Sequence, residues 1–164
     1  MERHRTESSP TAVIRVLKDH KDLLEASELV RRFSWGEDYP VAPLSEIEHA
    51  DYRVGAYANE KLIGFASVGR EFSPDRKDND ALWLAHAVVT PEFREQGVFQ
   101  KLYDEQMSFA LAGDAPVYSC TDNPVVESFF LSRGWQKVRD TKDEAGDPCR
   151  VYTYLRPQAV GGPR

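Results

Sequence analysis

Hydrophobic positions along this chain follow two different periods, and the alternation between them predicts a mixed α/β domain. Residues 12–17, with the sequence AVIRVL, are apolar and rich in β-branched side chains, which is typical of a strand. From Asp19 onward, apolar residues recur three and four positions apart as far as Phe33, and this spacing predicts a helix. Residues 34–43 contain one glycine and two prolines, so we expect a loop there, followed by a short helix over 44–50.

The middle of the chain predicts a β-hairpin and a buried strand. Residues 52–58 and 62–69 flank a short polar turn, which is the pattern of a hairpin. A charged loop over 71–80 follows, and we expect its charge run to be a solvated loop face. Residues 81–89 are apolar on both faces, which favours a central place in the sheet. The elements expected next are a helix beginning near residue 97, a strand over 115–120, a helix that Asn123 caps and Gly134 ends, and strands over 135–140 and 149–155.

These elements predict one α/β domain over residues 11–157, with a mixed central sheet of about six to seven strands and flanking helices. Residues 1–10 and 158–164 are expected to form a flexible arm and a flexible tail. A chain of 164 residues can bury one substantial core, whereas two domains would each be small. We expect the last strand, 149–155, at a sheet edge, where it would allow a homodimer.

Charge and hydropathy disfavour several classes of function. The chain has 21 Lys and Arg against 27 Asp and Glu residues, a formal net charge of −6, which argues against a nucleic-acid partner. Apolar stretches stay far below the roughly 20 residues of a membrane span, and no secretory signal is visible, so we expect a cytoplasmic protein without a membrane partner. Cys120 and Cys149 are too few for a disulfide framework and have no partner set for zinc, so we expect reduced thiols and no metal.

The segment with the most chemical information is residues 88–102, VVTPEFREQGVFQKL, which runs from a strand through a turn into a helix. Backbone N–H groups at a helix start lack intrahelical acceptors and lie at the positive end of the helix dipole, so they bind anions. Gly97 in the turn would let a phosphate approach the backbone closely. The alternative is that Gly97 serves only a tight turn.

This segment resembles the acetyl-CoA signature of the GNAT N-acetyltransferases, V-x-P-x-x-R-x-x-G-x-(G or A), which an amphipathic helix follows. The matching residues are Val89, Pro91, Arg94 and Gly97, and Phe99 stands where a small residue is usual. Residues 123–135, NPVVESFFLSRGW, resemble the second motif of the family, N-x-x-A-x-x-F-Y-x-x-x-G-F. Both motifs occur in the expected structural context, and the order of elements agrees over residues 11–155.

The resemblance implies a fold whose fourth and fifth strands splay apart, with acetyl-CoA as co-substrate between them. The backbone of residues 87–89 would pair with the pantetheine arm, and one N–H group there would polarise the thioester carbonyl. The N–H groups of residues 95–100 would hold the pyrophosphate. The implied cofactor-binding residues are Ala87, Val88, Val89, Arg94, Glu95, Gln96, Gly97, Val98, Phe99, Gln100 and Asn123, the last of which also suits a helix N-cap.

The resemblance also identifies a departure at the position of the general acid. The family often carries a tyrosine there that protonates the departing thiolate, and this chain has Phe130. General acid catalysis is typically worth about 10²–10⁴ in rate. A thiol pKa of roughly 8.5 makes the thiolate a tolerable leaving group without a proton. Tyr118, Ser132 or a water molecule are alternative donors.

A base is needed if the acceptor amine arrives as an ammonium ion. His86 comes just before the cofactor segment and belongs to a residue type that titrates near neutrality. Tyr118 is expected to face the same splayed region. We take both as candidate catalytic residues, with the alternative that each is an ordinary core residue. Cys120 has no activating partner nearby in sequence and is read as structural.

The acceptor site is expected in the loop after the first helix. Its aromatic and acidic side chains suit a cationic amine through charge and cation–π contact. The candidate substrate residues are Trp35, Asp38 and Tyr39, with Glu37 beside them. The alternative is a solvated loop that Trp35 attaches to the core.

The leading hypothesis is direct acetyl transfer, in a ternary complex, from acetyl-CoA to a primary amine of a small molecule or peptide. The alternative is a module of the same fold that binds CoA without efficient turnover, as a sensor or interaction subunit. Phe99 and Phe130 favour this alternative. The identity of the amine and the use of a longer acyl group stay open.

Overall fold

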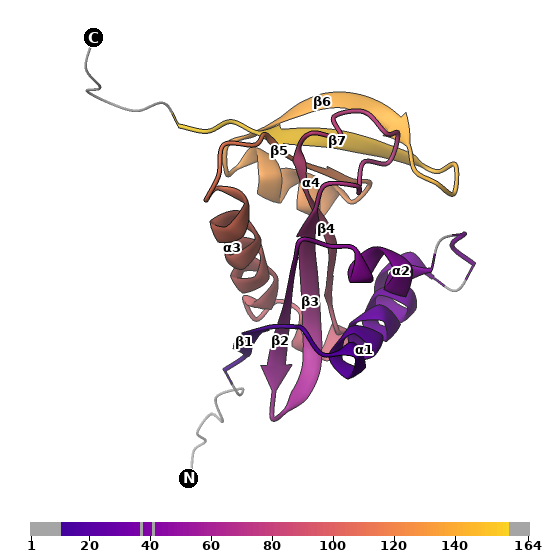
Figure 1. The fold of residues 1–164 in the computed structure, drawn as a ribbon. Helices are drawn as coiled ribbons and strands as arrows, with labels where there is room; N and C mark the ends of the chain where they lie inside the picture. The colour runs from indigo at the N-terminus through magenta and orange to yellow at the C-terminus, as the bar shows by residue number, and fades with distance from the viewer. Residues whose placement is uncertain (1–10, 37, 41, 158–164) are drawn as a thin grey trace.

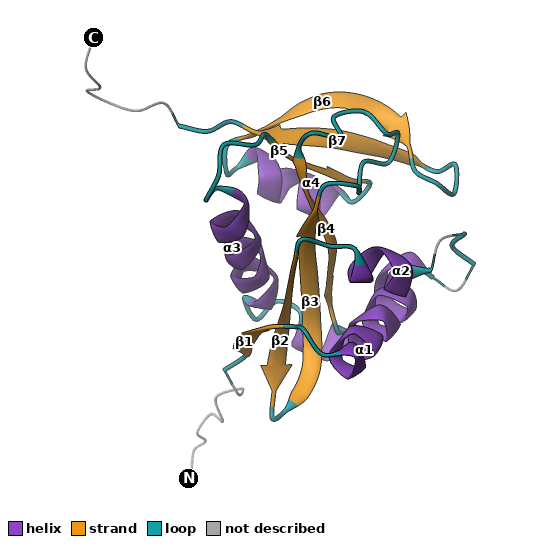
Figure 2. Ribbon diagram, viewed as in Figure 1, coloured by secondary structure: helices purple, strands orange, loops and turns teal. Residues whose placement is uncertain are grey.

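The computed structural model describes residues 11–36, 38–40 and 42–157. The arm over 1–10 and the tail over 158–164 lie outside the described residues. Figures 1 and 2 show the elements, which are β1 (Val13–Val16), α1 (His20–Val30), the π-helical turn η1 (Arg31–Trp35), α2 (Pro43–Glu48), β2 (Tyr52–Ala58), β3 (Lys61–Gly69), β4 (Leu82–Val89), the 3₁₀ turn η2 (Pro91–Phe93), α3 (Val98–Ala110), β5 (Val117–Thr121), α4 (Pro124–Leu131), β6 (Trp135–Lys142) and β7 (Pro148–Tyr154).

All seven strands belong to one mixed sheet with the order β1-β2-β3-β4-β5-β7-β6. Neighbouring strands are antiparallel except β4 and β5, which are parallel. The strand apolar on both faces, β4, lies in the middle of the sheet, as its pattern predicts. The expected mixed sheet of six to seven strands is therefore confirmed.

The sheet opens between β4 and β5. Their parallel register runs only from Leu82 opposite Val117 to Leu84 opposite Ser119. Beyond Leu84, β4 continues to Val89 without pairing to β5. The predicted splay is present, and it leaves the β5-facing edge of β4 open over its last residues.

Helices cover both faces of the sheet, and each face has its own core. Figure 1 shows α1 and α2 on one side of β2–β4 and α3 on the other. Under α1 and α2, Leu23, Val30 and Ile47 pack against Phe65 and other strand residues. The opposite face holds two clusters in which α3 and α4 pack on the strands, centred on Leu102, Met107 and Phe130. Because both cores adjoin β4, the open edge of this strand lies between two rigid layers.

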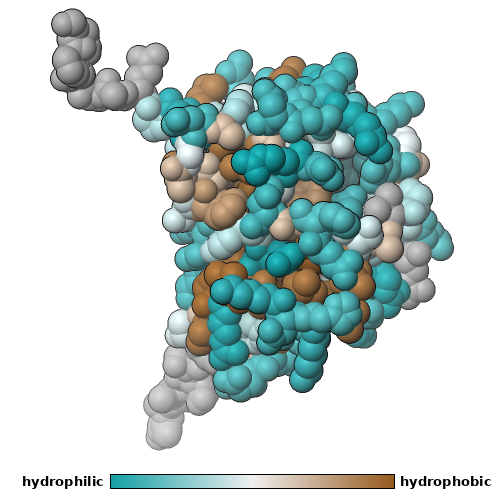
Figure 3. All heavy atoms as spheres, in the orientation of Figure 1, coloured by the Kyte–Doolittle hydropathy of each residue, from teal (hydrophilic) through white to brown (hydrophobic). Residues whose placement is uncertain are grey.

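The edges of the sheet are β1 and β6. The strand over 149–155 was expected at an edge, but β7 lies between β5 and β6 and is hydrogen-bonded on both sides. It therefore cannot pair across a dimer. At the other edge, Val13 and Val16 of β1 are about half exposed, at 51% and 50%. In the view of Figure 3 the surface is mostly hydrophilic, with apolar side chains gathered in separate patches across the middle.

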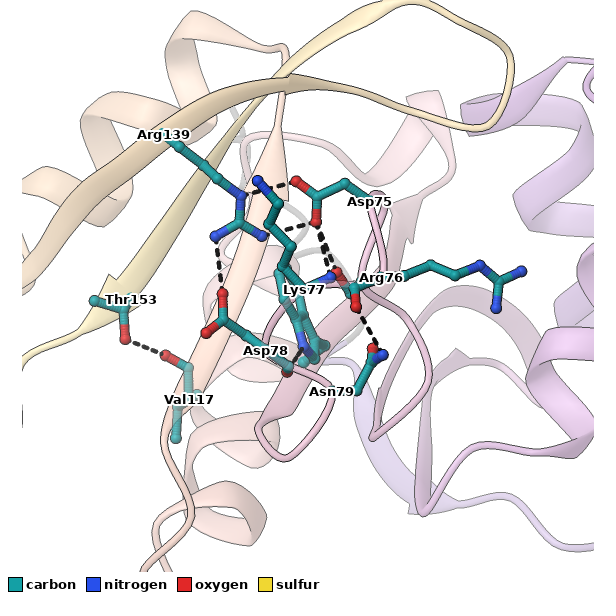
Figure 4. A network of polar contacts seen from close by, with 10 residues as sticks. Asp75, Arg76, Lys77, Asp78, Asn79, Val117, Arg139 and Thr153 are labelled. Atoms are coloured by element: carbon teal, nitrogen blue, oxygen red, sulfur yellow. Dashed lines mark hydrogen bonds and ion pairs between the residues drawn. The ribbon is translucent and has the colours of Figure 1, made fainter.

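A partly buried ion-pair network holds the loop between β3 and β4 to β6 (Figure 4). The Arg139 guanidinium donates two hydrogen bonds to Asp75 and one to Asp78, each 2.8 Å long. The side chains of Arg139 and Asp75 are only 18% and 15% exposed. The expected solvated face therefore holds for Arg76 and Lys77, which are exposed, but is wrong for Asp75 and Asp78, because Arg139 reaches both across the fold.

Candidate functional site

A cavity of about 880 Å³ lies at the splay between β4 and β5. Ligand pockets commonly measure about 300–1,000 Å³, so this one has room for a large ligand. One part of its wall comes from the end of β4, the turn before α3 and the start of α4. The other part comes from η1, α2, the β3–β4 loop and the β6–β7 loop. We call these the α3 half and the α2 half.

The α3 half contains a helix start suited to an anion. Gly97 caps α3 in the left-handed conformation, with φ of +83°, and Glu95 also has a positive φ of +63°. A Cβ added to Gly97 would meet nothing within 4 Å. The first N–H groups of a helix have no intrahelical acceptor. Open space therefore lies directly at a set of backbone donors, which is the arrangement that a phosphate group requires.

The structure brings most of the predicted cofactor residues together. The ones that line the cavity are Ala87, Val88, Val89, Arg94, Glu95, Gly97, Phe99, Gln100 and Asn123. The Val98 side chain is buried in the core instead, and the Gln96 amide donates to the Glu92 carbonyl oxygen. Arg94 Nε donates to the Val89 carbonyl oxygen at 2.8 Å and so fixes the turn.

Asn123 has the cap role that its sequence context predicts. Its Oδ1 accepts from the Val125 N–H at 2.8 Å. One side-chain acceptor is therefore committed to α4, while the residue still lines the cavity.

His86 sits at a β-bulge where β4 borders the cavity. Phe65 pairs with Val88 and Ser67 with Ala85, so His86 and Ala87 together oppose one residue of β3. His86 has φ of +60°. Its Nδ1 lies 2.6 Å from Ser67 Oγ and its Nε2 lies 2.9 Å from Glu46 Oε1. Both ring nitrogens are therefore engaged, and the side chain is 1% exposed.

Glu46 was not identified from the sequence, yet it is the more exposed member of this pair, and both residues line the cavity. Its side chain is 22% exposed and lines the α2 half. The chain Glu46–His86–Ser67 joins α2, β4 and β3 through two short contacts. In the sequence, Glu46 is visible only as an acidic residue on the expected short helix 44–50. No sequence pattern connects it to His86, which lies 40 residues further along the chain.

The α2 half combines aromatic rings with carboxylates. Trp35 lies 4.7 Å from Tyr39 and 5.4 Å from His86 between ring centroids, and all three line the cavity. Asp143 and Glu144 of the β6–β7 loop face the same space. Burial raises the pKa of Glu144, and the neighbouring carboxylates raise it further. Burial also raises the pKa of Tyr39, and the negative charges of Asp143 and Glu144 raise it further.

Two of the predicted site residues, Asp38 and Tyr118, do not line the cavity. Glu37 lies outside the described residues. Tyr118 was expected to face the splay, but it packs on Trp83 with ring centroids 5.2 Å apart. Its hydroxyl interacts with Asp78, on the other side of β5 from Ser119. Ser119, Cys120 and Thr121 line the cavity instead, nearer the open end of β5.

The position of the missing acid is apolar and mostly buried. Phe130 is 4% exposed, stacks on Trp135 with centroids 4.6 Å apart, and contributes one edge to the cavity wall. Ser132 donates to the Phe129 carbonyl oxygen on the surface and is not part of the wall. Tyr103 of α3 does line the cavity, and its hydroxyl accepts from Trp135 Nε1 at 2.8 Å.

The described residues contain no group of three His, Cys, Asp or Glu side chains arranged to hold a metal ion. None of their helices is long and apolar enough to cross a membrane.

A mixed sheet that opens between β4 and β5, with the start of α3 beside the open strand, is the arrangement of the acetyltransferase (GNAT) fold. The model of the acetyltransferase (GNAT) family matches residues 19–135, and the chain belongs to this family. No curated protein sequence matches the chain significantly.

Solved structures confirm the fold. The ribosomal-protein-S18-alanine N-acetyltransferase from Escherichia coli superposes with a TM-score of 0.70 at 15% identity, covering 93% of this chain and 99% of that one. An aminoglycoside 6'-N-acetyltransferase complexed with coenzyme A gives 0.65 at 17% identity, covering 89% and 99%. FeeM, an N-acyl amino acid synthase from uncultured soil microbes, gives 0.68 at 15% identity, covering 89% and 91%. Family and neighbours together support an acyltransferase that uses a CoA-type co-substrate.

Proposed function

We propose that this protein is an acetyl-CoA-dependent N-acetyltransferase that moves the acetyl group directly to a primary amine in a ternary complex. The observation that carries the proposal is the cavity at the β4–β5 splay, which contains both halves. One half offers backbone donors for a phosphate, and the other offers carboxylates and aromatic rings for a cation. A donor and an acceptor held in these two halves would meet at the β4 bulge.

The α3 half suits the CoA moiety. The N–H groups that follow Gly97 would hold the pyrophosphate, and the empty space at this glycine leaves room for it. The β5-facing edge of β4 has no strand partner beyond Leu84, so the peptide groups on that edge are available to the amides of the pantetheine arm. An N–H group of residues 87–89 would stabilise the oxygen of the thioester carbonyl as charge develops there.

The α2 half suits the amine. Trp35 and Tyr39 would contact a cation with their ring faces, and Glu46, Asp143 and Glu144 would offset its charge. A small-molecule or peptide amine fits this chemistry. The net charge of −6 agrees with a cationic acceptor.

Glu46 is placed to accept the proton that the ammonium must lose. An alkyl ammonium has a pKa of about 10.4, so it needs a base at neutral pH. His86, the base suggested by sequence, is enclosed, and its Nε2 contacts Glu46 instead of the cavity. We assign removal of this proton to the Glu46 carboxylate. His86 and Ser67 position that carboxylate through the contacts described above. The freed amine then attacks the carbonyl carbon, the C–S bond breaks with its electron pair leaving on sulfur, and the second proton of the nitrogen passes to the thiolate, directly or through water.

The same chemistry is consistent with action in the cytoplasm, where acetyl-CoA and reduced thiols are both present. Cys120 and Cys149 are free thiols in this structure.

The experiment that tests the proposal is release of free CoA thiol from acetyl-CoA across a panel of mono- and polyamines, amino acids and peptides. We expect release above the hydrolysis background with at least one amine. One observation favours a second function: Phe130 leaves the acid position without a donor. A CoA-binding module without turnover would bind acetyl-CoA in a thermal-shift assay and release no thiol with any amine.

A further inference from the structure

Cys120 and Cys149 lie together on the wall of the cavity, although 28 intervening residues separate them in the sequence. Cys120 of β5 pairs with Val151 of β7, and Thr121 pairs with Arg150. Cys149 is two residues from Val151, so it lies on the same face as Cys120 and diagonal to it. The two side chains form a thiol–thiol hydrogen bond.

The pair is chemically unequal. The hydrogen bond between the thiols raises the pKa of Cys120, and burial raises it further. The same interaction with Cys120 lowers the pKa of Cys149. A thiolate is the reactive form of cysteine. We therefore take Cys149 as the attacking thiol of the pair and Cys120 as the thiol that closes the disulfide.

The surroundings of the pair argue against other roles. Within the described part of the chain no third ligand completes a metal site. The proposed acyl transfer uses neither sulfur. The cavity opens to both cysteines, which gives a small solute access to residues that are otherwise mostly buried.

We propose that Cys120 and Cys149 are a redox-active dithiol that a hydroperoxide converts into an intramolecular disulfide. The Cys149 thiolate attacks one peroxide oxygen, the O–O bond breaks, and Cys149 becomes a sulfenic acid while hydroxide or an alkoxide leaves. Cys120 sulfur then attacks the Cys149 sulfur, the S–O bond breaks, and water leaves with the Cys120 proton. Each disulfide formed consumes two thiols and one hydroperoxide.

The disulfide would change the α2 half of the cavity. A disulfide needs Cα atoms within about 7 Å of each other. Diagonal neighbours of an antiparallel pair lie about 7–8 Å apart, so the bond draws the start of β7 toward β5. Asp143, Glu144 and Asp147 line the cavity just before Cys149 and move with it. This consequence rests on the proposed function: oxidation raises the KM for the amine, whereas CoA binding in the α3 half changes less.

The test is intact-mass analysis of the reduced protein after hydrogen peroxide treatment, denaturation and alkylation. We expect the wild-type chain to lose two hydrogen atoms, to take up no alkyl group, and to recover both thiols with dithiothreitol. In Cys120→Ser, Cys149 stops at a sulfenic acid that dimedone traps. In Cys149→Ser, Cys120 stays reduced and is alkylated. Melting temperatures of both variants check that they fold.

Three results would overturn the proposal. The first is two alkylated thiols in the peroxide-treated wild type, and the second is disulfides that form only between chains. The third is over-oxidation of Cys149 in the wild type as readily as in Cys120→Ser. The readout is mass and not activity, so it is independent of acyl transfer. A disulfide that forms in a protein without thiol-releasing activity contradicts the proposed function and leaves the dithiol standing.

Discussion

Glu46 Oε1 lies 2.9 Å from His86 Nε2, across 40 residues of sequence and between a helix and a central strand. Trp35 and Phe72 enclose the imidazole ring, with centroids 5.4 and 4.8 Å away. The His86 side chain is only 1% exposed, whereas that of Glu46 is 22% exposed. A ligand in the cavity therefore has more access to the Glu46 carboxylate than to the imidazole ring.

Replacing Glu46 by Gln removes the proposed proton acceptor and keeps the shape of the side chain. We expect the rate of amine acetylation near neutral pH to fall by about 10²–10⁴, the range of general base catalysis. The deficit should shrink as the pH rises toward about 10.4, because the amine then arrives deprotonated. The pH profile of thiol release measures this. Glu48→Gln on the same helix is the matched control, since Glu48 does not line the cavity, and equal losses in both variants would refute the assignment.

Gly97→Ala adds a Cβ in the space proposed for the pyrophosphate. We expect at least tenfold weaker acetyl-CoA binding, about 1.4 kcal/mol, as measured by calorimetric titration. The positive φ of +83° also strains an alanine, by about 1–2 kcal/mol. Gly134→Ala controls for this strain, because Gly134 has φ of +91° and lies away from the cavity. Normal CoA binding by Gly97→Ala would show that the phosphate lies elsewhere.

Phe130→Tyr places a hydroxyl where the family usually has one. Because an edge of Phe130 forms part of the cavity wall, we expect a small change in melting temperature and thiol release up to about tenfold faster, if thiolate departure limits the rate. A hydroxyl sealed in the core would instead cost roughly 1–3 kcal/mol. Loss of stability without any gain in rate would mean that the Phe130 edge faces Trp135 and not the cofactor.

Arg139→Met removes the cation that holds the β3–β4 loop. Two partly buried carboxylates then lose their partner, and we expect a loss of about 3 kcal/mol in the free energy of unfolding at pH 7 by urea denaturation. The hydrogen bonds from Arg139 hold the pKa of Asp75 well below its usual range. A lowered folded-state pKa stabilises the fold above the unfolded value of about 3.9 and loses that contribution as the pH falls.

The difference in stability between wild type and Arg139→Met should therefore be largest near neutrality and shrink below about pH 4. Lys137→Met, which breaks an exposed pair with Asp140 on the same strand, should change stability by less than about 1 kcal/mol at any pH. A difference between wild type and Arg139→Met that stays constant down to pH 2 would contradict the linkage to Asp75.

The sequence predicts the elements well because each rests on local periodicity and local caps. Asn123 caps α4, Gly97 begins α3, and β4 is central, all as expected. The two cofactor motifs are contiguous in sequence, so most of their residues meet in one wall without knowledge of the fold.

Long-range pairing accounts for what sequence could not show. The contacts of His86 with Glu46 and Ser67, and of Arg139 with Asp75, join segments that are 19 to 64 residues apart. Periodicity gives no register between such segments. Tyr118 was misplaced because a five-residue strand gives little alternation to fix which side chain faces the cleft. The order of the last two strands also depends on pairing, which places β7 inside the sheet.

The most direct test of the account is transfer of an isotopically labelled acetyl group, followed by mass spectrometry of both the amine panel and the intact protein. We expect labelled N-acetylated product from at least one cationic amine, and no acetylated protein when acetyl-CoA is supplied alone. Label that accumulates on the protein first would contradict direct transfer, and label that reaches no amine would contradict the proposed enzyme.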